Sequence, residues 1–338
     1  MAKRPTRTAN PDAPSSSAVA EPVLPDLELL LELIGLPGPS GDEAPVAAFL
    51  EGYLSANVAS AKVTRLQDNL IVTRGTPTTA IFAHTDTIGY TLGYKGSLIP
   101  IGGPDGADGD LLKCTTTAGL TGTFRLRGSG GGKRRKRTPS TRRSCGLGRV
   151  EGGDAEPGSR WVYAAKPEVD AKKRTITSPY LDDRAGVWAA LQALKRSENV
   201  AVAFCTGEEQ HGHGARVCAE VLYREHGVAQ ALVSDITWHT DDTPCGKGVV
   251  ISLRDAFCPR QSFVDRVLDL AAESGIACQR EIQSAGSSDG GHILRSPVPM
   301  DWVFVGAPEK RPHTSREQAH LPDLAAMADL LTYLVGKL

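Results

Sequence analysis

Five short segments each place side chains that can bind a divalent metal beside an apolar run. They are IFAHTD with His84, SPYLDDRAG with Asp182, AFCTGEE with Glu209, LVSD with Asp235 and KRPHTS with His313. Imidazole and carboxylate ligands without a thiolate suit zinc, cobalt or manganese rather than a structural cysteine site. Two metals about 3.5–4 Å apart share a carboxylate and together can activate a water for hydrolysis. The segments therefore predict a hydrolytic site with two divalent metals, with zinc as the first choice.

The carboxylates of these segments are suited to different tasks. Asp182 opens a predicted helix, and we expect it to bridge the two metals. Asp86 follows His84 by two residues, so it lies on the same side of an extended segment and can accept the second ring N–H of that histidine, which fixes the tautomer. Glu208 and Glu209 are adjacent, so their side chains diverge. One can bind a metal, and the other can act as a general base whose pKa is raised by burial among carboxylates.

Local patterns predict the elements that carry these residues. Leu and Ile at helical spacing in PDLELLLELIGL, and Ser40 three residues before Glu43, predict two helices near the N-terminus, the second with a capping box. TTAIFAH and VAVAFCT are typical of buried strands, and a further helix starts near Arg184. In an open α/β sheet, ligands gather at the carboxyl ends of the strands. We therefore expect the residues after these apolar runs to share one cleft.

The alternation of strands and helices predicts an α/β fold with a mainly parallel, doubly wound sheet of the phosphorylase/hydrolase type. Residues 25–90 and 178–338 carry this pattern and are predicted to form the catalytic domain. Residues 91–177 are rich in Gly, Thr and Ser with short strands, which predicts an inserted β domain. Within it, residues 128–149 form a basic Gly/Arg/Ser loop. Residues 1–24 are predicted to be a disordered tail.

The basic segment 128–149 has no acidic residue. It could bind a nucleic acid or an acidic partner, or it could be a solvated loop, or it could be foreign to the ancestral fold, for example through a local reading-frame disturbance. We favour the solvated loop because no aromatic residues accompany the basic ones for stacking on bases. We therefore expect no nucleic-acid partner.

Composition limits the remaining possibilities. The chain has 338 residues, of which 40% are hydrophobic and 23% charged, and its formal net charge is -1, as is ordinary for a soluble globular protein. Its apolar runs are far shorter than the roughly 20 residues that cross a bilayer, so we expect no membrane partner. Seven scattered cysteines without a C-x-x-C pair favour reduced thiols and a cytoplasmic location.

Taken together, the segments resemble the tetrahedral and deblocking (glutamyl-type) aminopeptidases, di-metal exopeptidases of the leucine-aminopeptidase-like group. The similarity is carried by LPGPSGDE, DNLIV, HTDTIG, DDRAG, GEE, SSDGGH and RPHTSRE, which extend over nearly the whole ordered chain. The long insert lies between His84 and Asp182, as in this branch, rather than before the last ligand as in the related carboxypeptidases and deacylases. The resemblance implies a peptide substrate, a metal-dependent aminopeptidase activity and a homo-oligomer.

The resemblance also implies how the ligands are divided. His84 and Asp235 would hold one metal. Glu209 and His313 would hold the other, with Asp182 as the bridge.

Three further assignments complete the predicted site. The resemblance implies that Glu208 is the general base and that the peptide bond between Asp182 and Asp183 is cis. The Gly-Ser loop SAGSSDGGH contains Asp289 and His292, which are predicted either to line the substrate pocket or to be ordinary polar loop residues.

Other functions remain open at this point. An N-acyl amino acid deacylase or dipeptidase would use the same metal chemistry on a different substrate. A glycosidase using Glu208 and Glu209 is a weaker alternative, because such enzymes separate their carboxylates by about 5–9.5 Å across the scissile bond. A nucleic-acid-associated protein that relies on its basic segment is a third alternative.

Overall fold

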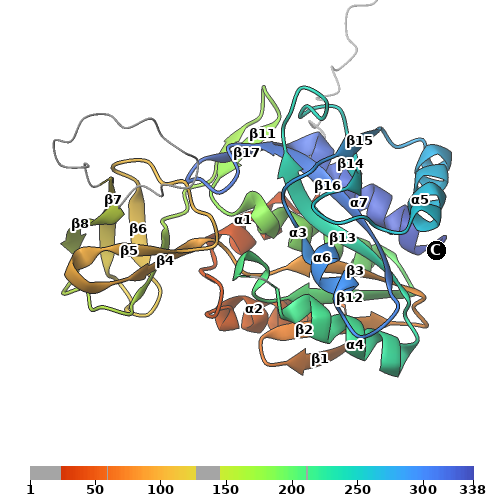
Figure 1. Cartoon of the computed structure of the whole chain (residues 1–338), viewed down its shortest axis with the longest axis horizontal. Helices are drawn as coiled ribbons and strands as arrows, with labels where there is room; N and C mark the ends of the chain where they lie inside the picture. The colour runs from red at the N-terminus through yellow and green to blue at the C-terminus, as the bar shows by residue number, and fades with distance from the viewer. Residues whose placement is uncertain (1–23, 59, 127–144, 211) are drawn as a thin grey trace, which may run out of the picture.

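A computed structural model describes residues 24–58, 60–126, 145–210 and 212–338 of the chain. The fold is mixed α/β, as predicted, with a large mixed sheet and a separate curled antiparallel sheet that lies to one side of it (Figure 1). The α-helices are α1 (Leu27–Gly35), α2 (Ala44–Asn57), α3 (Leu181–Arg196), α4 (Gly214–His226), α5 (Gln261–Ser274), α6 (Asp289–Leu294) and α7 (Leu321–Val335).

The large sheet has a parallel centre with antiparallel flanks. Strands β12, β3, β13 and β16 lie side by side and run parallel. The strands of this sheet are β1 (Lys62–Leu66), β2 (Asn69–Arg74), β3 (Thr79–His84), β10 (Glu168–Asp170), β11 (Thr175–Ser178), β12 (Val200–Cys205), β13 (Gln230–Trp238), β14 (Val249–Arg254), β15 (Cys278–Ile282), β16 (Asp301–Lys310) and β17 (Glu317–His320).

The sheet is therefore mixed rather than mainly parallel. On one side, β1 and β2 form an antiparallel hairpin that continues into β12. On the other side, β16, β17, β11 and β10 pair antiparallel in turn, and β14 pairs antiparallel with β16. Antiparallel neighbours need no helical crossover. The alternation of helices and strands in the sequence therefore predicted the parallel centre but not these flanks.

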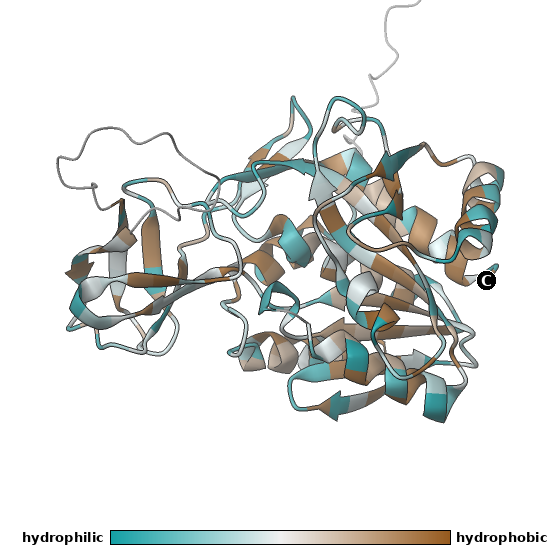
Figure 2. Cartoon of the chain, in the orientation of Figure 1, coloured by the Kyte–Doolittle hydropathy of each residue, from teal (hydrophilic) through white to brown (hydrophobic). Residues whose placement is uncertain are grey.

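Helices pack on both faces of the large sheet. Along β3, Ile81 and Ala83 join the apolar cluster that contains α1, α2, α3, α5 and α7, whereas Ala80 and Phe82 join the cluster that contains α4 and α6. Successive strand residues point to opposite faces, so a strand covered on both faces must be apolar throughout. This requirement explains the continuous apolar runs before the predicted ligands, and the central strands are correspondingly apolar in Figure 2.

The second sheet has the strand order β5-β4-β9-β6-β7-β8 within the described residues. Its strands are β4 (Gly89–Leu92), β5 (Leu98–Ile101), β6 (Leu111–Cys114), β7 (Thr121–Leu126), β8 (Cys145–Glu151) and β9 (Arg160–Tyr163). Its own apolar cluster includes Trp161, Tyr90 and Tyr163. Residues 164–177, which follow β9, were assigned to the insert from their composition. Their strands β10 and β11 instead belong to the large sheet. Composition could not reveal this, because the pairing of β11 with β17 joins distant parts of the chain.

Parts of two predicted segments lie outside the described residues. Residues 1–23 of the predicted tail and residues 128–144 of the predicted basic loop are among them. The last residues of that loop, 145–149, belong to strand β8. Leu24, the end of the predicted tail, is buried in the main core. None of the helices in the described part of the chain combines the length and the apolar character needed to span a membrane.

Candidate metal centre

The five predicted metal ligands come from five different elements that meet at one end of the central strands. His84 ends β3, Asp182 lies at the start of α3, Glu209 lies in the 3-10 helix η2 (Glu208–Gln210) after β12, Asp235 lies in β13, and His313 lies in the loop between β16 and β17. Asp235 was expected at a strand end, but β13 continues to Trp238 because it pairs with β16 along its whole length. The part of β13 beyond Asp235, residues 236–238, therefore lies beside the centre and lines the pocket there.

The carboxylate of Asp182 lies between two histidines. His84 Nε2 is 3.0 Å from Asp182 Oδ1 and 3.7 Å from Asp235 Oδ1. His313 Nε2 is 3.4 Å from Asp182 Oδ2 and 3.5 Å from Glu209 Oε1. Each oxygen of Asp182 thus faces a different histidine, and each histidine also lies near a second carboxylate, Asp235 for His84 and Glu209 for His313.

These spacings match those of ligands around a metal. Donor atoms bound at about 2.1 Å in a tetrahedral site lie about 3.4 Å from one another. The four donor distances range from 3.0 to 3.7 Å. The donor set therefore fits two metals that share one carboxylate.

Main-chain carbonyls orient both histidine rings. Nδ1 of His84 lies 3.2 Å from the carbonyl oxygen of Asp86, and Nδ1 of His313 lies 3.3 Å from that of Gly103. A carbonyl can only accept, so Nδ1 of each ring donates in these contacts, and in the neutral form of each ring Nε2 would be the nitrogen that can bind a metal. The carboxylate Oδ1 of Asp86, predicted to be the partner of His84, lies slightly farther from Nδ1 at 3.4 Å.

The Asp86 carboxylate instead orients the turn that carries the paired glutamates. Its Oδ1 accepts the N–H of Glu208 and its Oδ2 accepts the N–H of Glu209, each at 3.0 Å. Ser40 Oγ donates to Oδ2 at 2.6 Å. The predicted capping box is therefore wrong: Glu43 is the N-cap of α2, without a side-chain cap, because the hydroxyl of Ser40 is used by Asp86.

The centre contains more buried carboxylates than positive protein groups to balance them. Burial raises the pKa of several acids here, in the case of Glu209 to about 8; the others are Asp183, Glu208, Asp235, Glu309 and Glu317. The buried guanidinium of Arg184 donates to the carbonyls of Thr85 and Leu36 rather than to these carboxylates. Buried carboxylates are usually paired or coordinate metals, so the charge balance also favours cations in the centre.

Without a bound metal, the positive charge of the two histidines partly offsets this negative charge. Burial lowers the pKa of His313, but Asp182 and Glu209 outweigh that effect and raise it to about 10. For His84, burial likewise lowers the pKa, and hydrogen bonds with Asp182 and Asp86 outweigh it. Burial raises the pKa of Asp182, but the two histidines hold it well below its usual value.

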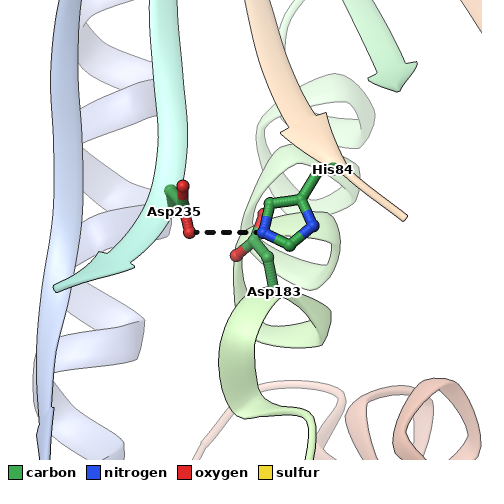
Figure 3. A group of neighbouring side chains, drawn as sticks. All are labelled: His84, Asp183 and Asp235. Atoms are coloured by element: carbon green, nitrogen blue, oxygen red, sulfur yellow. Dashed lines mark ion pairs between the residues drawn. The ribbon is translucent and has the colours of Figure 1, made fainter. Parts of the chain in front are cut away.

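Asp183, the neighbour of Asp182 in the segment SPYLDDRAG, also lies at the centre, although it was not among the five predicted ligands. Its carboxylate, His84 and Asp235 offer donor atoms within 4.8 Å of one another, as do Asp182, Glu209 and His313. Figure 3 shows Asp183 beside His84 and opposite Asp235. The signal for Asp183 in the sequence was its position directly after Asp182. The peptide bond between Asp182 and Asp183 is cis, which confirms the expectation from the resemblance.

The predicted substrate-binding residues Asp289 and His292 lie in α6 rather than in a loop, and both are buried. Burial raises the pKa of Asp289 to about 7. The loop just before them lines the pocket at the metal centre, through Ser287 and Ser288. A role for Asp289 and His292 in substrate binding stays a prediction.

The second sheet contributes a loop that touches two of the candidate ligands. After β5, the carbonyl of Gly103 faces the ring of His313, and the N–H of Asp105 donates to the carbonyl of His313 at 2.9 Å. Gly102 has a φ of +69°, and a Cβ there would lie 2.6 Å from Glu209 Oε2. This loop therefore packs directly against Glu209 and His313.

We expect Gly102→Ala to weaken metal binding by about 10- to 100-fold, as losses of outer-shell support typically do. The added methyl group would push Glu209 away, and the positive φ would strain the alanine. The control is Gly109→Ala, which also has a positive φ but no atom within 4 Å of the added carbon. Metal per chain, measured after dialysis against buffered metal, should fall only in Gly102→Ala. Equal occupancy in both variants would contradict this reading of the contact.

Comparison with known proteins identifies the family. The model of the M42 glutamyl aminopeptidase family matches residues 150–330, which is more than half of the chain. The chain belongs to the M42 glutamyl aminopeptidase family. The matched region includes Asp182, Glu208, Glu209, Asp235 and His313. The predicted activity is thereby confirmed: this M42 chain is a metal-dependent aminopeptidase that hydrolyses peptide bonds.

Solved structures share the fold of this M42 aminopeptidase. A TET aminopeptidase from a marine sediment Thaumarchaeota archaeon is 21% identical, with a TM-score of 0.81, over 92% of this chain and 97% of the other. The Pyrococcus horikoshii TET1 peptidase, described as assembling into a tetrahedron or a large octahedral shell, is 24% identical, with a TM-score of 0.74, over 92% of this chain and 99% of the other. A comparison with curated proteins gave no match.

Proposed function

We propose that this M42 aminopeptidase removes N-terminal residues from peptides at a centre for two divalent metals. One metal would be held by His84 and Asp235, and the other by Glu209 and His313. Asp182 would bridge them. The observation that supports this proposal most directly is the position of Asp182, whose two oxygens each face a different histidine.

The protein's own residues supply the proton transfer and the positioning. When bound, a metal pair polarises the scissile carbonyl and lowers the pKa of water. Glu208 lines the same pocket as His84, Asp182 and His313. Burial raises the pKa of Glu208 well above its usual value, which suits a group that must take a proton from water and return it to the leaving amine. Asp86 acts as a positioning residue through its bonds to the N–H groups of both glutamates.

The donor set of imidazole nitrogens and carboxylate oxygens supports zinc as the first choice, with cobalt or manganese as alternatives. We further propose a catalytic domain formed by residues 25–90 and 178–338, joined by β10 and β11 of the large sheet, and an inserted domain formed by the remainder of residues 91–177. The self-contained six-stranded sheet among the described residues supports this division.

We also propose a homo-oligomer, in keeping with the oligomeric assembly named for the P. horikoshii structure. A cytoplasmic location is supported by the scattered spacing of the seven cysteines, without a C-x-x-C pair.

Removal of metal is expected to abolish hydrolysis of aminoacyl p-nitroanilides, and adding zinc, cobalt or manganese should restore it. The apoprotein should also melt several degrees lower, because a ligand at 100 times its Kd stabilises the folded state by about 2.7 kcal/mol. Both the rate and the melting temperature are measured after chelation, dialysis and re-addition of each metal. Hydrolysis that persists in protein shown to be free of metal would contradict the proposal.

A matched substrate pair tests the dependence on a free amine. A peptide with a free N-terminus and its N-acetylated form are offered to the metal-loaded enzyme. Only the free form should be cleaved, whereas a deacylase working on the same scaffold would process the acetylated form.

A further inference from the structure

A pocket of about 150 Å³ extends from the metal centre along strand β13. At one end its lining includes the candidate ligands His84, Asp182, Asp235 and His313. Thr237, two residues beyond Asp235, also lines the pocket and lies on the same side of the strand, about 7 Å farther along. The pocket therefore begins where the scissile bond would lie and leads away from it.

Two carboxylates lie in the wall of this pocket beyond the metal centre. Glu281 Oε1 accepts hydrogen bonds from Thr237 Oγ1 at 2.6 Å and from Gln283 Nε2 at 2.7 Å. Asp255 Oδ1 accepts the N–H of Phe257 at 2.6 Å. Both acids are largely buried, and these bonds hold their carboxylates in fixed positions.

The two carboxylates have no cationic partner in the part of the chain that the structure describes. Neither Asp255 nor Glu281 belongs to any ion pair there, and the pocket lining contains no Lys or Arg among the described residues. Burial and the charge of Glu281 raise the pKa of Asp255. A cation in the pocket would therefore offset the cost of burying the charged form of Asp255 and its repulsion with Glu281.

The rest of the wall suits an aliphatic chain. Trp238, which is 48% exposed, and the buried Phe304 also line the pocket. The long stems of Lys and Arg pack on apolar surface while their charged ends reach polar groups, and an indole face also attracts cations. An extended Lys side chain places Nζ about 6 Å from its Cα. That length is close to the roughly 7 Å between Asp235 and Thr237 along the strand, and the Thr237 hydroxyl donates to Glu281.

Because this pocket adjoins the proposed metal centre, the following inference rests on the proposed function. We propose that this aminopeptidase prefers substrates whose N-terminal residue has a cationic side chain, lysine or arginine, with Glu281 and Asp255 as the residues that pair with it. A glutamyl side chain, which the family name suggests, would place a third carboxylate in the same pocket and is disfavoured.

The test compares side chains of similar length and different charge. Metal-loaded wild-type enzyme is assayed with p-nitroanilides of lysine, arginine, norleucine and glutamate. We expect kcat/KM for the lysyl substrate to exceed that for the norleucyl substrate by about 10- to 100-fold, the range for a buried charge pair, and the glutamyl substrate to be the poorest. Inhibition by free lysine and by free norleucine gives a second readout, with the lower Ki expected for lysine.

Glu281→Gln keeps the shape of the side chain and removes its charge. It should lower the ratio of lysyl to norleucyl kcat/KM by about 10-fold or more. The control Glu273→Gln removes an exposed charge from α5 and should keep the wild-type ratio. Asp255→Asn provides a second variant if Glu281→Gln gives no cooperative melting transition.

The possible outcomes separate the two proposals. A wild-type enzyme that cleaves norleucyl or glutamyl substrates as well as lysyl ones would overturn the specificity and leave the metal-dependent activity intact. An unchanged ratio in both variants would overturn the assignment of the two carboxylates. Metal-loaded protein that cleaves none of the four anilides would instead overturn the proposed function.

Discussion

Glu208→Gln is expected to lower kcat by about 10²- to 10⁴-fold, the usual contribution of a general base. Glutamine keeps the size of the side chain but cannot take a proton from water. Glu208 is not among the proposed metal ligands, and its main-chain N–H remains held by Asp86. Metal content and melting temperature should therefore stay at the wild-type level, and KM should change little. Steady-state kinetics and elemental analysis of the same preparation check these expectations.

The matched control for this variant is Glu225→Gln, an exposed position in α4, which should behave as wild type. A Glu208→Gln enzyme with wild-type kcat would remove Glu208 from the catalytic role. A variant that loses both activity and metal would instead mean that Glu208 is itself a ligand.

Asp182→Asn is expected to disrupt both metal positions at once. The proposed bridge uses both oxygens of Asp182, toward His84 on one side and His313 on the other. Asparagine offers one oxygen and no charge, so at least one position loses an anionic ligand. We expect metal affinity to fall by more than about 100-fold, beyond the 10- to 100-fold loss typical of outer-shell changes, and activity to fall with it. Metal titration of the apoprotein, followed by melting temperature, measures the effect without relying on catalysis.

Asp269→Asn is the control for this charge change, because Asp269 is exposed on α5 and is not among the residues that line the pocket at the centre. It should bind metal as wild type does. If Asp182→Asn loses one metal and keeps the other at full affinity, Asp182 would be a ligand of one site rather than a bridge.

The sequence by itself was enough to indicate the family and the types of the candidate ligands. Each apolar run had to be a strand buried on both faces, so polar residues at its end or shortly beyond it, such as His84 and Glu209, were expected at the sheet edge where ligands gather. The Asp-Asp pair at the start of a predicted helix was an equally clear signal in the sequence. These signals are local, because strand burial and helix initiation depend on a few neighbouring residues. They can therefore be recognised without knowledge of the tertiary contacts.

Tertiary structure decided which groups surround those ligands. Ser40 matched a capping pattern, yet its hydroxyl bonds Asp86, 46 residues away. The ring of His313 is oriented by the carbonyl of Gly103 in another sheet. Glu281 reaches the pocket because β15 pairs with β14, which pairs with β16. Contacts between distant segments depend on how the sheets and loops pack against one another, and no local pattern in the sequence encodes that packing.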